Sequence, residues 1–148
     1  MADRLVPGMQ AAVTAIFGAP EVAAFVALSG DDNPIHLDAA AASAAGFERE
    51  IVHGALVLGL ISRLLGTTLP GPGTVIIEQQ IRYRRPVFVG EPVTAHVEVT
   101  SVREDKPVVT LRTWVETSDV ALDGETVVVV RTLAPAPNAE FDAASPRR

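Results

Sequence analysis

The alternation between apolar and polar residues divides the chain into a helical first half and a second half with strand periodicity. Residues 53–66 read HGALVLGLISRLLG, and only Ser62 and Arg63 interrupt the apolar run of this segment. A helix that is apolar nearly all round is usually buried in its domain. The pattern therefore predicts a central helix that begins at Gly54 and is enclosed by the rest of the protein.

Downstream of this segment the apolar residues recur with a period of two, which is typical of antiparallel strands with one buried face. The pattern covers residues 75–84, 93–100, 109–115 and 126–134. In the first of these strands one face is expected to carry Val75, Ile77, Ile81 and Tyr83. Gly90-Glu91-Pro92 marks one turn, and Asp123-Gly124 is the clearest turn signal between strands.

The region before the buried helix predicts a strand and two short helices. Residues 10–17 read as a strand, and residues 21–28 read as a helix with Glu21 in its first turn, where an acid favours the helix dipole. Asp38 can cap a second helix over residues 39–45. The chain as a whole predicts an α+β architecture, in which an antiparallel sheet of about five strands curls around one long helix.

Composition limits the number of domains and the kinds of partner. A length of 148 residues predicts a single domain over residues 1–134, followed by a loosely ordered tail over residues 135–148. The net charge of -6 and the single lysine, Lys106, argue against a nucleic-acid surface. A small anionic ligand remains compatible with the sequence, because arginines supply the other basic residues.

The sequence also limits the expected location of the protein. The N-terminal residues MADRLVPGMQ lack the apolar core of a signal peptide. Residues 54–66 are too short to cross a bilayer, which needs about 20 residues. Cysteine is absent, which fits a reducing compartment. We therefore expect a soluble, cytoplasmic protein that does not bind membranes.

The loop LSGDDNPIHLD, residues 28–38, carries the most distinctive chemistry. Asp31 and His36 are five residues apart, which on a helix would point them about 140° away from each other. Pro34 disfavours a continuous helix, and a turn there can bring the carboxylate and the imidazole to one point. Such a pair can activate water and move a proton. Taken alone, the stretch is more often plain turn chemistry, in which Ser29 or Asp31 caps the backbone.

Two residues of the predicted buried helix extend this hypothesis. The N–H of Gly54 would lie unpaired at the positive end of the helix dipole, where it can hold a developing oxyanion. The alternative, which spacing alone favours, is that Gly54 only permits close packing. Ser62 lies two turns further on, and it either touches the site or bonds back to the carbonyl of Leu58.

Three segments in this order resemble the MaoC-like, (R)-specific enoyl-CoA hydratases. They are FVALSGDDNPIHLD (25–38), FEREIVHGALVLGLISRLLG (47–66) and RRPVFVGEPVTAHVEV (84–99). The likeness covers most of residues 10–134, and S-G-D-x-N-P-x-H is its most specific element. The resemblance implies a hot dog fold, in which a curved antiparallel sheet wraps one long helix, and it implies a homodimer. Because independent segments agree, it favours a site over plain turn chemistry.

The same resemblance implies reversible addition of water to a trans-2-enoyl-CoA, which gives the (R)-3-hydroxyacyl product. By position, Asp31 and His36 would be the catalytic pair, and the N–H of Gly54 would polarise the thioester carbonyl. Asn33 would hold the loop or the water, and Ser62 would support the site from the helix. No metal and no separate cofactor are implied, since coenzyme A enters as part of the acyl-CoA substrate.

Other residues carry weaker hypotheses. Arg82, Arg84 and Arg85 form the densest basic cluster and are candidates for the phosphates of coenzyme A, with solvated surface charges as an equal alternative. Trp114 either marks a dimer contact or is a lone exposed aromatic residue. His96 falls on the polar face of its strand, which predicts a surface position.

Rival functions of hot dog proteins fit the sequence less well. A thioesterase of this fold would need an Asp or Glu on the central helix or facing it, and residues 54–66 contain no carboxylate. The same absence disfavours the acyl-carrier-protein dehydratases that pair a loop histidine with a helix glutamate. A non-catalytic module that binds acyl thioesters is the third alternative, and it leaves the presence of Asp31, His36 and Gly54 unexplained.

Overall fold

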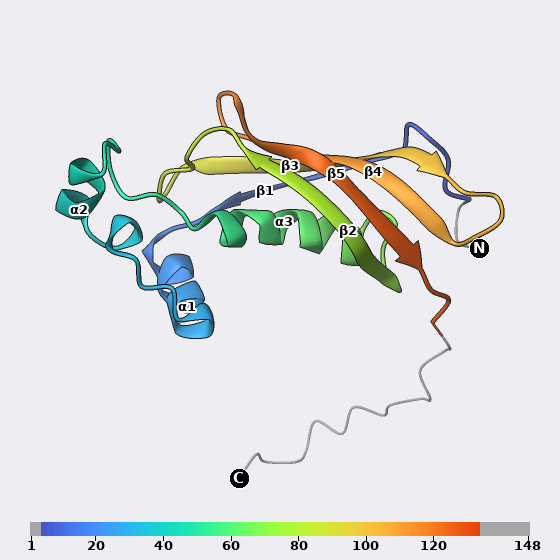
Figure 1. Ribbon diagram of the computed structural model, residues 1–148, viewed down its shortest axis with the longest axis horizontal. Coiled ribbons are helices and arrows are strands. Elements are labelled where there is room, and N and C mark those ends of the chain that lie inside the picture. Colours follow the sequence, from blue (N-terminus) through green and yellow to red (C-terminus); the bar gives the residue numbers. More distant parts are fainter. Residues whose placement is uncertain (1–3, 134–148) are drawn as a thin grey trace, which may run out of the picture.

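The computed structural model describes residues 4–133, which form one open antiparallel sheet lying over a central helix. The elements are β1 (Gln10–Ile16), α1 (Ala19–Ser29), the 3-10 turn η1 (Pro34–His36), α2 (Ala39–Ala44), α3 (Gly54–Thr67), β2 (Thr74–Tyr83), β3 (Pro92–Val102), β4 (Val108–Glu116) and β5 (Val120–Val130). The strands follow the order β1-β3-β4-β5-β2. In Figure 1 the sheet covers one side of α3, while α1 and α2 project beyond one end of the sheet.

This arrangement confirms the predicted α+β architecture with a sheet of five strands and one long helix. The tail predicted over residues 135–148 lies outside the described residues, as does the predicted end of the last strand at residue 134. No helix within residues 4–133 is long and apolar enough to span a membrane.

The core forms where the large apolar side chains of α3 meet the inner face of the sheet. The buried residues of the helix are Val57, Leu60, Ile61, Leu64 and Leu65. Alternate residues of β3 and β4 are buried against them, as the two-residue period predicts. Each large side chain removed from water in this way contributes about 1.5–3 kcal/mol to folding.

The prediction that α3 is enclosed on every side is wrong for the single chain. Ala55, Gly59, Ser62 and Gly66 are exposed, and their spacing places them along one side of the helix. The physical reason is that one open sheet covers only the opposite side. These four residues are small, so this side of α3, which is flanked by the exposed Arg63, offers a shallow, accessible surface.

The turn predicted at Asp123-Gly124 is also wrong, because both residues lie inside β5. Gly124 pairs with β2 on one side and with β4 on the other. A Cβ atom at Gly124 would run into the backbone carbonyl oxygen of Gln80 in β2. The glycine is therefore needed for the close approach of two strands, and the true turn between β4 and β5 falls at residues 117–119.

A β-bulge at Ile77 interrupts the single alternating pattern predicted for β2. Upstream of it, Ile76 pairs with a fully buried valine of β5 and so lies on the inner face of the sheet, although it is 38% exposed at the edge. Downstream, Ile81 and Tyr83 pair with β5 residues of that same face. The predicted face that joined Val75 to Ile81 and Tyr83 is therefore wrong, because the extra residue reverses the phase of the strand.

The outer face of the sheet carries a stacked cluster around Trp114. The His96 ring lies parallel to the Trp114 ring, with centroids 4.7 Å apart, and the Arg112 guanidinium lies 4.6 Å from the Trp114 centroid. His96 Nε2 is 2.9 Å from Oε1 of Glu116. Trp114 is therefore not a lone exposed aromatic residue, and His96 is partly covered by its neighbours.

Candidate active site

The loop between α1 and η1 is folded by its own short polar side chains. Ser29 Oγ accepts the N–H of Asp31 at 3.1 Å. Asp31 Oδ1 accepts the N–H of Asn33 at 3.2 Å, and Asn33 Oδ1 accepts the N–H of Ile35 at 3.3 Å. The first is the bond of an ST turn and the other two are the bonds of Asx turns, which Asp and Asn favour. The loop therefore does contain the turn hydrogen bonds that were the alternative to a functional site. The same hydrogen bonds fix the orientation of the Asp31 and Asn33 side chains.

Asp31 and His36 converge with His53 at the beginning of α3. Each of the three side chains offers a polar atom that lies within 4.8 Å of the others. The Asp31 side chain is 52% exposed, whereas His36 is 8% exposed and His53 only 2%. The cluster thus combines a carboxylate that reaches solvent with two imidazoles buried beneath it.

Two backbone carbonyls determine which ring nitrogen of each histidine carries the hydrogen. His36 Nδ1 lies 2.6 Å from the carbonyl oxygen of Ile51. Because a carbonyl only accepts, Nδ1 is the donor and the lone pair of His36 remains on Nε2. By the same reasoning His53 donates from Nε2 to the carbonyl oxygen of Asp31, 2.9 Å away. Its Nδ1 is buried without a partner within the described residues.

The first residue of α3 brings a backbone donor next to this cluster. The carbonyl of His53 accepts the N–H groups of Leu56 and Val57, which starts the helix. The N–H of Gly54 makes no hydrogen bond within residues 4–133. It lies at the positive end of the α3 dipole, where a negative charge is stabilised. Gly54 thus presents an unpaired N–H donor directly after His53, whose ring stacks on His36.

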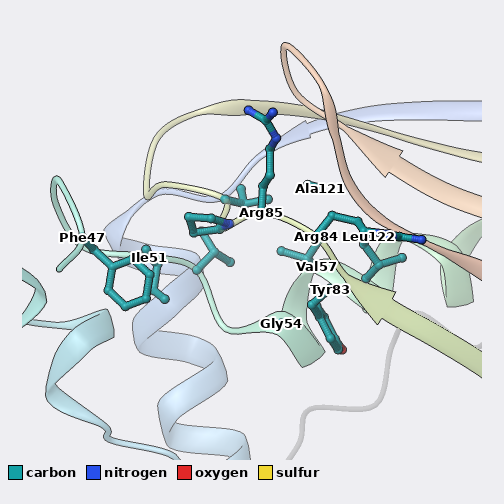
Figure 2. Close-up of a pocket in the computed structure, with 12 residues that line it drawn as sticks. Phe47, Ile51, Gly54, Val57, Tyr83, Arg84, Arg85, Ala121 and Leu122 are labelled. Carbon is teal, nitrogen blue, oxygen red and sulfur yellow. The ribbon is translucent and has the colours of Figure 1, made fainter. Parts of the chain in front are cut away.

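A cavity of about 390 Å³ opens beside Gly54. Its lining is mostly apolar and includes Phe47, Ile51, Val57, Tyr83, Pro86 and Leu122. Figure 2 shows the Tyr83 ring beside Gly54, with Arg85 pointing away from both. Asp31 and His36 do not line this cavity. Ile51 connects the cavity to the cluster of Asp31, His36 and His53. It lines the cavity, and its carbonyl oxygen accepts the hydrogen bond from His36 Nδ1.

Comparison with known proteins identifies the family. Residues 9–121 match the MaoC like domain. The chain belongs to the MaoC-like family. It is 52% identical over 129 residues to the (R)-specific enoyl-CoA hydratase of Aeromonas caviae, which covers 86% of this chain and 96% of that protein. It is 41% identical to the 3-hydroxybutyryl-CoA dehydratase of Methylorubrum extorquens, over 74% of this chain and 71% of that protein.

A solved structure supports the same assignment. The (R)-hydratase from A. caviae, described as involved in PHA biosynthesis, matches with a TM-score of 0.84 at 50% identity, covering 87% of this chain and 99% of that one. The family and the hot dog fold expected from the sequence motifs are thus confirmed. In this MaoC-like chain the sheet stays open and does not close into a barrel.

Ser62 does not join the cluster of this MaoC-like domain. It is exposed on the uncovered side of α3, about two turns or 12 Å along the helix from Gly54. The predicted alternative, a bond from Ser62 to the carbonyl of Leu58, is not among the hydrogen bonds of residues 4–133. Ser62 therefore faces the space next to α3 that the single chain leaves open.

The three arginines occupy different positions. Arg84 and Arg85 line the cavity beside Gly54, but Arg82 does not. Arg84 Nε lies 3.0 Å from Asp123, and Arg85 Nη2 lies 2.8 Å from Asp119. Exposed ion pairs of this kind contribute little to stability, so either guanidinium is available to an anionic ligand.

His53 is the residue of this site that sequence reasoning missed. It immediately precedes Gly54 in the quoted motif IVHG, but only the glycine was given a role. The signal was the position itself, because a histidine at the head of an apolar helix is a polar group in a buried place. Its bond to Asp31 spans 22 residues and cannot be read from local spacing.

Asp31, His36 and His53 also form the one group of acidic and histidine side chains within residues 4–133 that is compact enough to consider for a metal ion. One nitrogen of each ring is already bonded to a backbone carbonyl. The two rings stack with an interplanar angle of 29°. The other nitrogen of each ring, Nε2 of His36 and Nδ1 of His53, is the atom that could accept a proton or bind an ion.

Proposed function

We propose that this MaoC-like protein is an (R)-specific enoyl-CoA hydratase, which reversibly adds water to trans-2-enoyl-CoA to give (R)-3-hydroxyacyl-CoA. The observation that carries the proposal is the convergence of Asp31 and His36 at the beginning of α3, next to the open N–H of Gly54. The 52% identity to an (R)-specific enoyl-CoA hydratase supports the same activity.

In this proposal Asp31 and His36 are the catalytic pair. The oxygen of a water bonds to C3 of the substrate as the double bond between C2 and C3 breaks, and a proton is delivered to C2. Two free acceptors support this role, namely Nε2 of His36 and Oδ2 of Asp31, which accepts no hydrogen bond within residues 4–133. The proton of the water leaves through this pair, and the pair returns one to C2.

Gly54 stabilises the charge that this addition creates. As the hydroxyl group bonds to C3, negative charge moves onto the thioester oxygen and an enolate forms. The N–H of Gly54 and the positive end of α3 are fixed before the reaction starts, so no reorganisation is needed to stabilise that oxygen. Asn33 acts indirectly, because its side chain holds the turn that carries His36.

The protein acts as a homodimer in this proposal. Within residues 4–133 the outer edge of β2 is unpaired, and Val75, Ile76 and Ile77 are 38–57% exposed there. An apolar edge strand is a template for pairing with another strand. A second chain at this edge would also cover the open side of α3, and Ser62 would then contribute to an enclosed acyl site.

The substrate is an acyl-CoA, and Arg84 and Arg85 are the candidates for its phosphates because they line the cavity at Gly54. Arg82 lines a second hollow, which shares Arg84 with the first, and is the weaker candidate because it does not reach the cavity at Gly54. Hydration needs an oxyanion donor and a positioned water, and in this proposal Gly54 and the Asp31–His36 pair supply them without redox chemistry, so we propose neither a metal nor a separate cofactor. A chain without cysteine suits the reducing cytoplasm, where we place the activity.

The experiment that tests this function follows the ultraviolet absorbance of the conjugated enoyl thioester after the protein is added. We expect the absorbance to fall with short or medium acyl chains, and a dehydrogenase specific for the (R) product to detect the 3-hydroxyacyl-CoA. Free thiol release is measured in parallel. Thiol release that matches the fall in absorbance, with no (R)-3-hydroxyacyl-CoA formed, would instead identify a thioesterase and reject the proposal.

A further inference from the structure

We propose that His53 is a positioning residue for the hydration reaction. It fixes the positions of Asp31, His36 and the N–H of Gly54 relative to one another without touching the substrate. The inference rests on the proposed hydratase function. It starts from two contacts of the His53 side chain and from the place of this residue in the sequence. His53 donates to the carbonyl oxygen of Asp31 at 2.9 Å, it stacks on His36 with ring centroids 3.7 Å apart, and it directly precedes Gly54.

The bond to Asp31 fixes the backbone that carries the carboxylate. Asp31 Oδ1 already accepts the N–H of Asn33, so both the backbone and one carboxylate oxygen of Asp31 are held. The other oxygen, Oδ2, lies 4.0 Å from His53 Nε2, which is beyond hydrogen-bond distance. His53 thus orients the acid and leaves Oδ2 available to a water.

The stacking contact restricts the orientation of His36. The His53 ring contacts His36 and also Phe25, whose centroid is 4.7 Å away. Together with the bond from His36 Nδ1 to Ile51, this packing holds the His36 ring from one face and from one edge. The free Nε2 therefore keeps one direction, as a general base requires.

The cost of burying His53 indicates that its donor has a function. His53 is 2% exposed, and its Nδ1 has no partner within the described residues. Burying an unpaired polar atom is unfavourable, and a protonated ring would add a buried charge and an unpaired donor. A residue selected only to fill this space would be apolar. The neutral ring with its hydrogen on Nε2 is the form that fits.

The backbone of His53 connects the same cluster to the helix. Its carbonyl accepts the first N–H groups of α3, from Leu56 and Val57. One residue therefore joins the loop of Asp31 to the start of α3, across a sequence separation of 22 residues. A displacement of His53 would move the catalytic pair relative to the N–H of Gly54.

Two substitutions separate the donor from the ring. His53→Phe keeps a ring stacked on His36 but cannot donate to Asp31. His53→Gln keeps an N–H donor of similar reach but lacks the ring. The matched control is His96→Gln, which changes the partly buried histidine on the outer face of the sheet, away from the site.

We expect His53→Phe to lower kcat by about 100-fold, the loss that a misplacement of about 1 Å can cause, with little change in KM. His53→Gln should recover part of this loss, and His96→Gln should match the unmodified protein. Rates are expressed per folded enzyme, with the thermal unfolding midpoint of each variant measured alongside. If His53→Phe does not fold, His53→Met replaces it, since methionine adapts to irregular space and lacks the donor.

A kcat of His53→Phe close to that of the unmodified protein would overturn the positioning role. So would losses in His53→Phe and His53→Gln that follow only the fall in stability, because a purely structural residue would show no rescue by a donor. These outcomes leave the hydratase function standing. An unmodified protein that hydrates no enoyl-CoA would reject the function itself.

Discussion

The Tyr83 ring lies so close to Gly54 that a Cβ atom at this position would be 2.6 Å from Cε1 of the ring. Tyr83 is at the end of β2, and Gly54 is the first residue of α3, so the contact joins the edge of the sheet to the helix that carries the open N–H. Close packing and an oxyanion donor stood as alternatives for Gly54. The structure supports the first directly, and the unpaired N–H leaves room for the second.

Gly54→Ala should therefore lower hydratase activity, because the new methyl group displaces the Tyr83 ring or occupies the space next to the N–H. The double variant Gly54→Ala with Tyr83→Ala removes the clash and should recover part of the lost kcat/KM. Gly66→Ala is the control, since a Cβ atom there has nothing within 4 Å. Full activity of Gly54→Ala would show that the contact with Tyr83 is unimportant for the reaction.

Asp31→Asn and His36→Gln should each reduce kcat by about 10²–10⁴-fold, the range of general acid–base catalysis. Neither change removes much volume, so far-ultraviolet circular dichroism should remain that of the unmodified protein. Asp32→Asn is the matched control, because Asp32 is the adjacent exposed carboxylate and lies outside the cluster with His36 and His53. Equal losses in Asp31→Asn and Asp32→Asn would point to net charge and not to a specific pair.

Gly124→Ala should destabilise the fold by about 1–3 kcal/mol, the usual cost of overpacking. The added Cβ atom meets the backbone carbonyl of Gln80, which cannot rotate away as a side chain would. Urea denaturation measures the change in the free energy of unfolding. Gly66→Ala in α3 serves as the control, and there alanine should stabilise the helix by up to about 1 kcal/mol. Equal stability of the two variants would contradict the close approach of β2 and β5.

Arg85→Ala should raise KM for an enoyl-CoA and leave KM for a truncated enoyl thioester of N-acetylcysteamine unchanged, because only coenzyme A carries phosphates. The control is Arg103→Ala. Arg103 pairs with Asp105 at 2.7 Å much as Arg85 pairs with Asp119 at 2.8 Å, but it lies in the turn between β3 and β4. A parallel rise of KM for both thioesters would assign Arg85 to the fold and not to the phosphates.

Ile77→Lys should convert a dimer to monomers in sedimentation velocity, because it places a charge on the unpaired edge of β2. Ile16→Lys is matched in exposure, at 56% against 57%, and lies at the end of β1 on the opposite edge of the sheet. It should leave the dimer intact. If the unmodified protein is itself monomeric, the homodimer proposal fails before either variant is needed.

The sequence could reveal the chemistry of the site because that information is local. The side-chain turns at Ser29, Asp31 and Asn33 depend on residues two positions apart, and Pro34 restricts the backbone wherever the chain lies. The start of α3 at Gly54 likewise follows from a continuous apolar run. These features do not require knowledge of the sheet.

The missed features all depend on residues distant in the sequence. Gly124 appeared as a turn residue because an Asp-Gly pair favours turns, and only the position of Gln80 in the neighbouring strand explains the glycine. The bulge at Ile77 depends on the pairing of β2 with β5. His53 acquires its partners only when the loop of Asp31 folds against the start of α3.

By itself the sequence determined most of the elements, the family and the residues that we propose as the catalytic pair, since periodicity, turn residues and a specific motif are properties of short segments. The tertiary structure decided which side of α3 stays open, which nitrogen of each histidine carries the hydrogen, and which residue lies beneath the Asp31–His36 pair. These depend on where carbonyls and strands from other parts of the chain lie in space, and no local spacing encodes those positions.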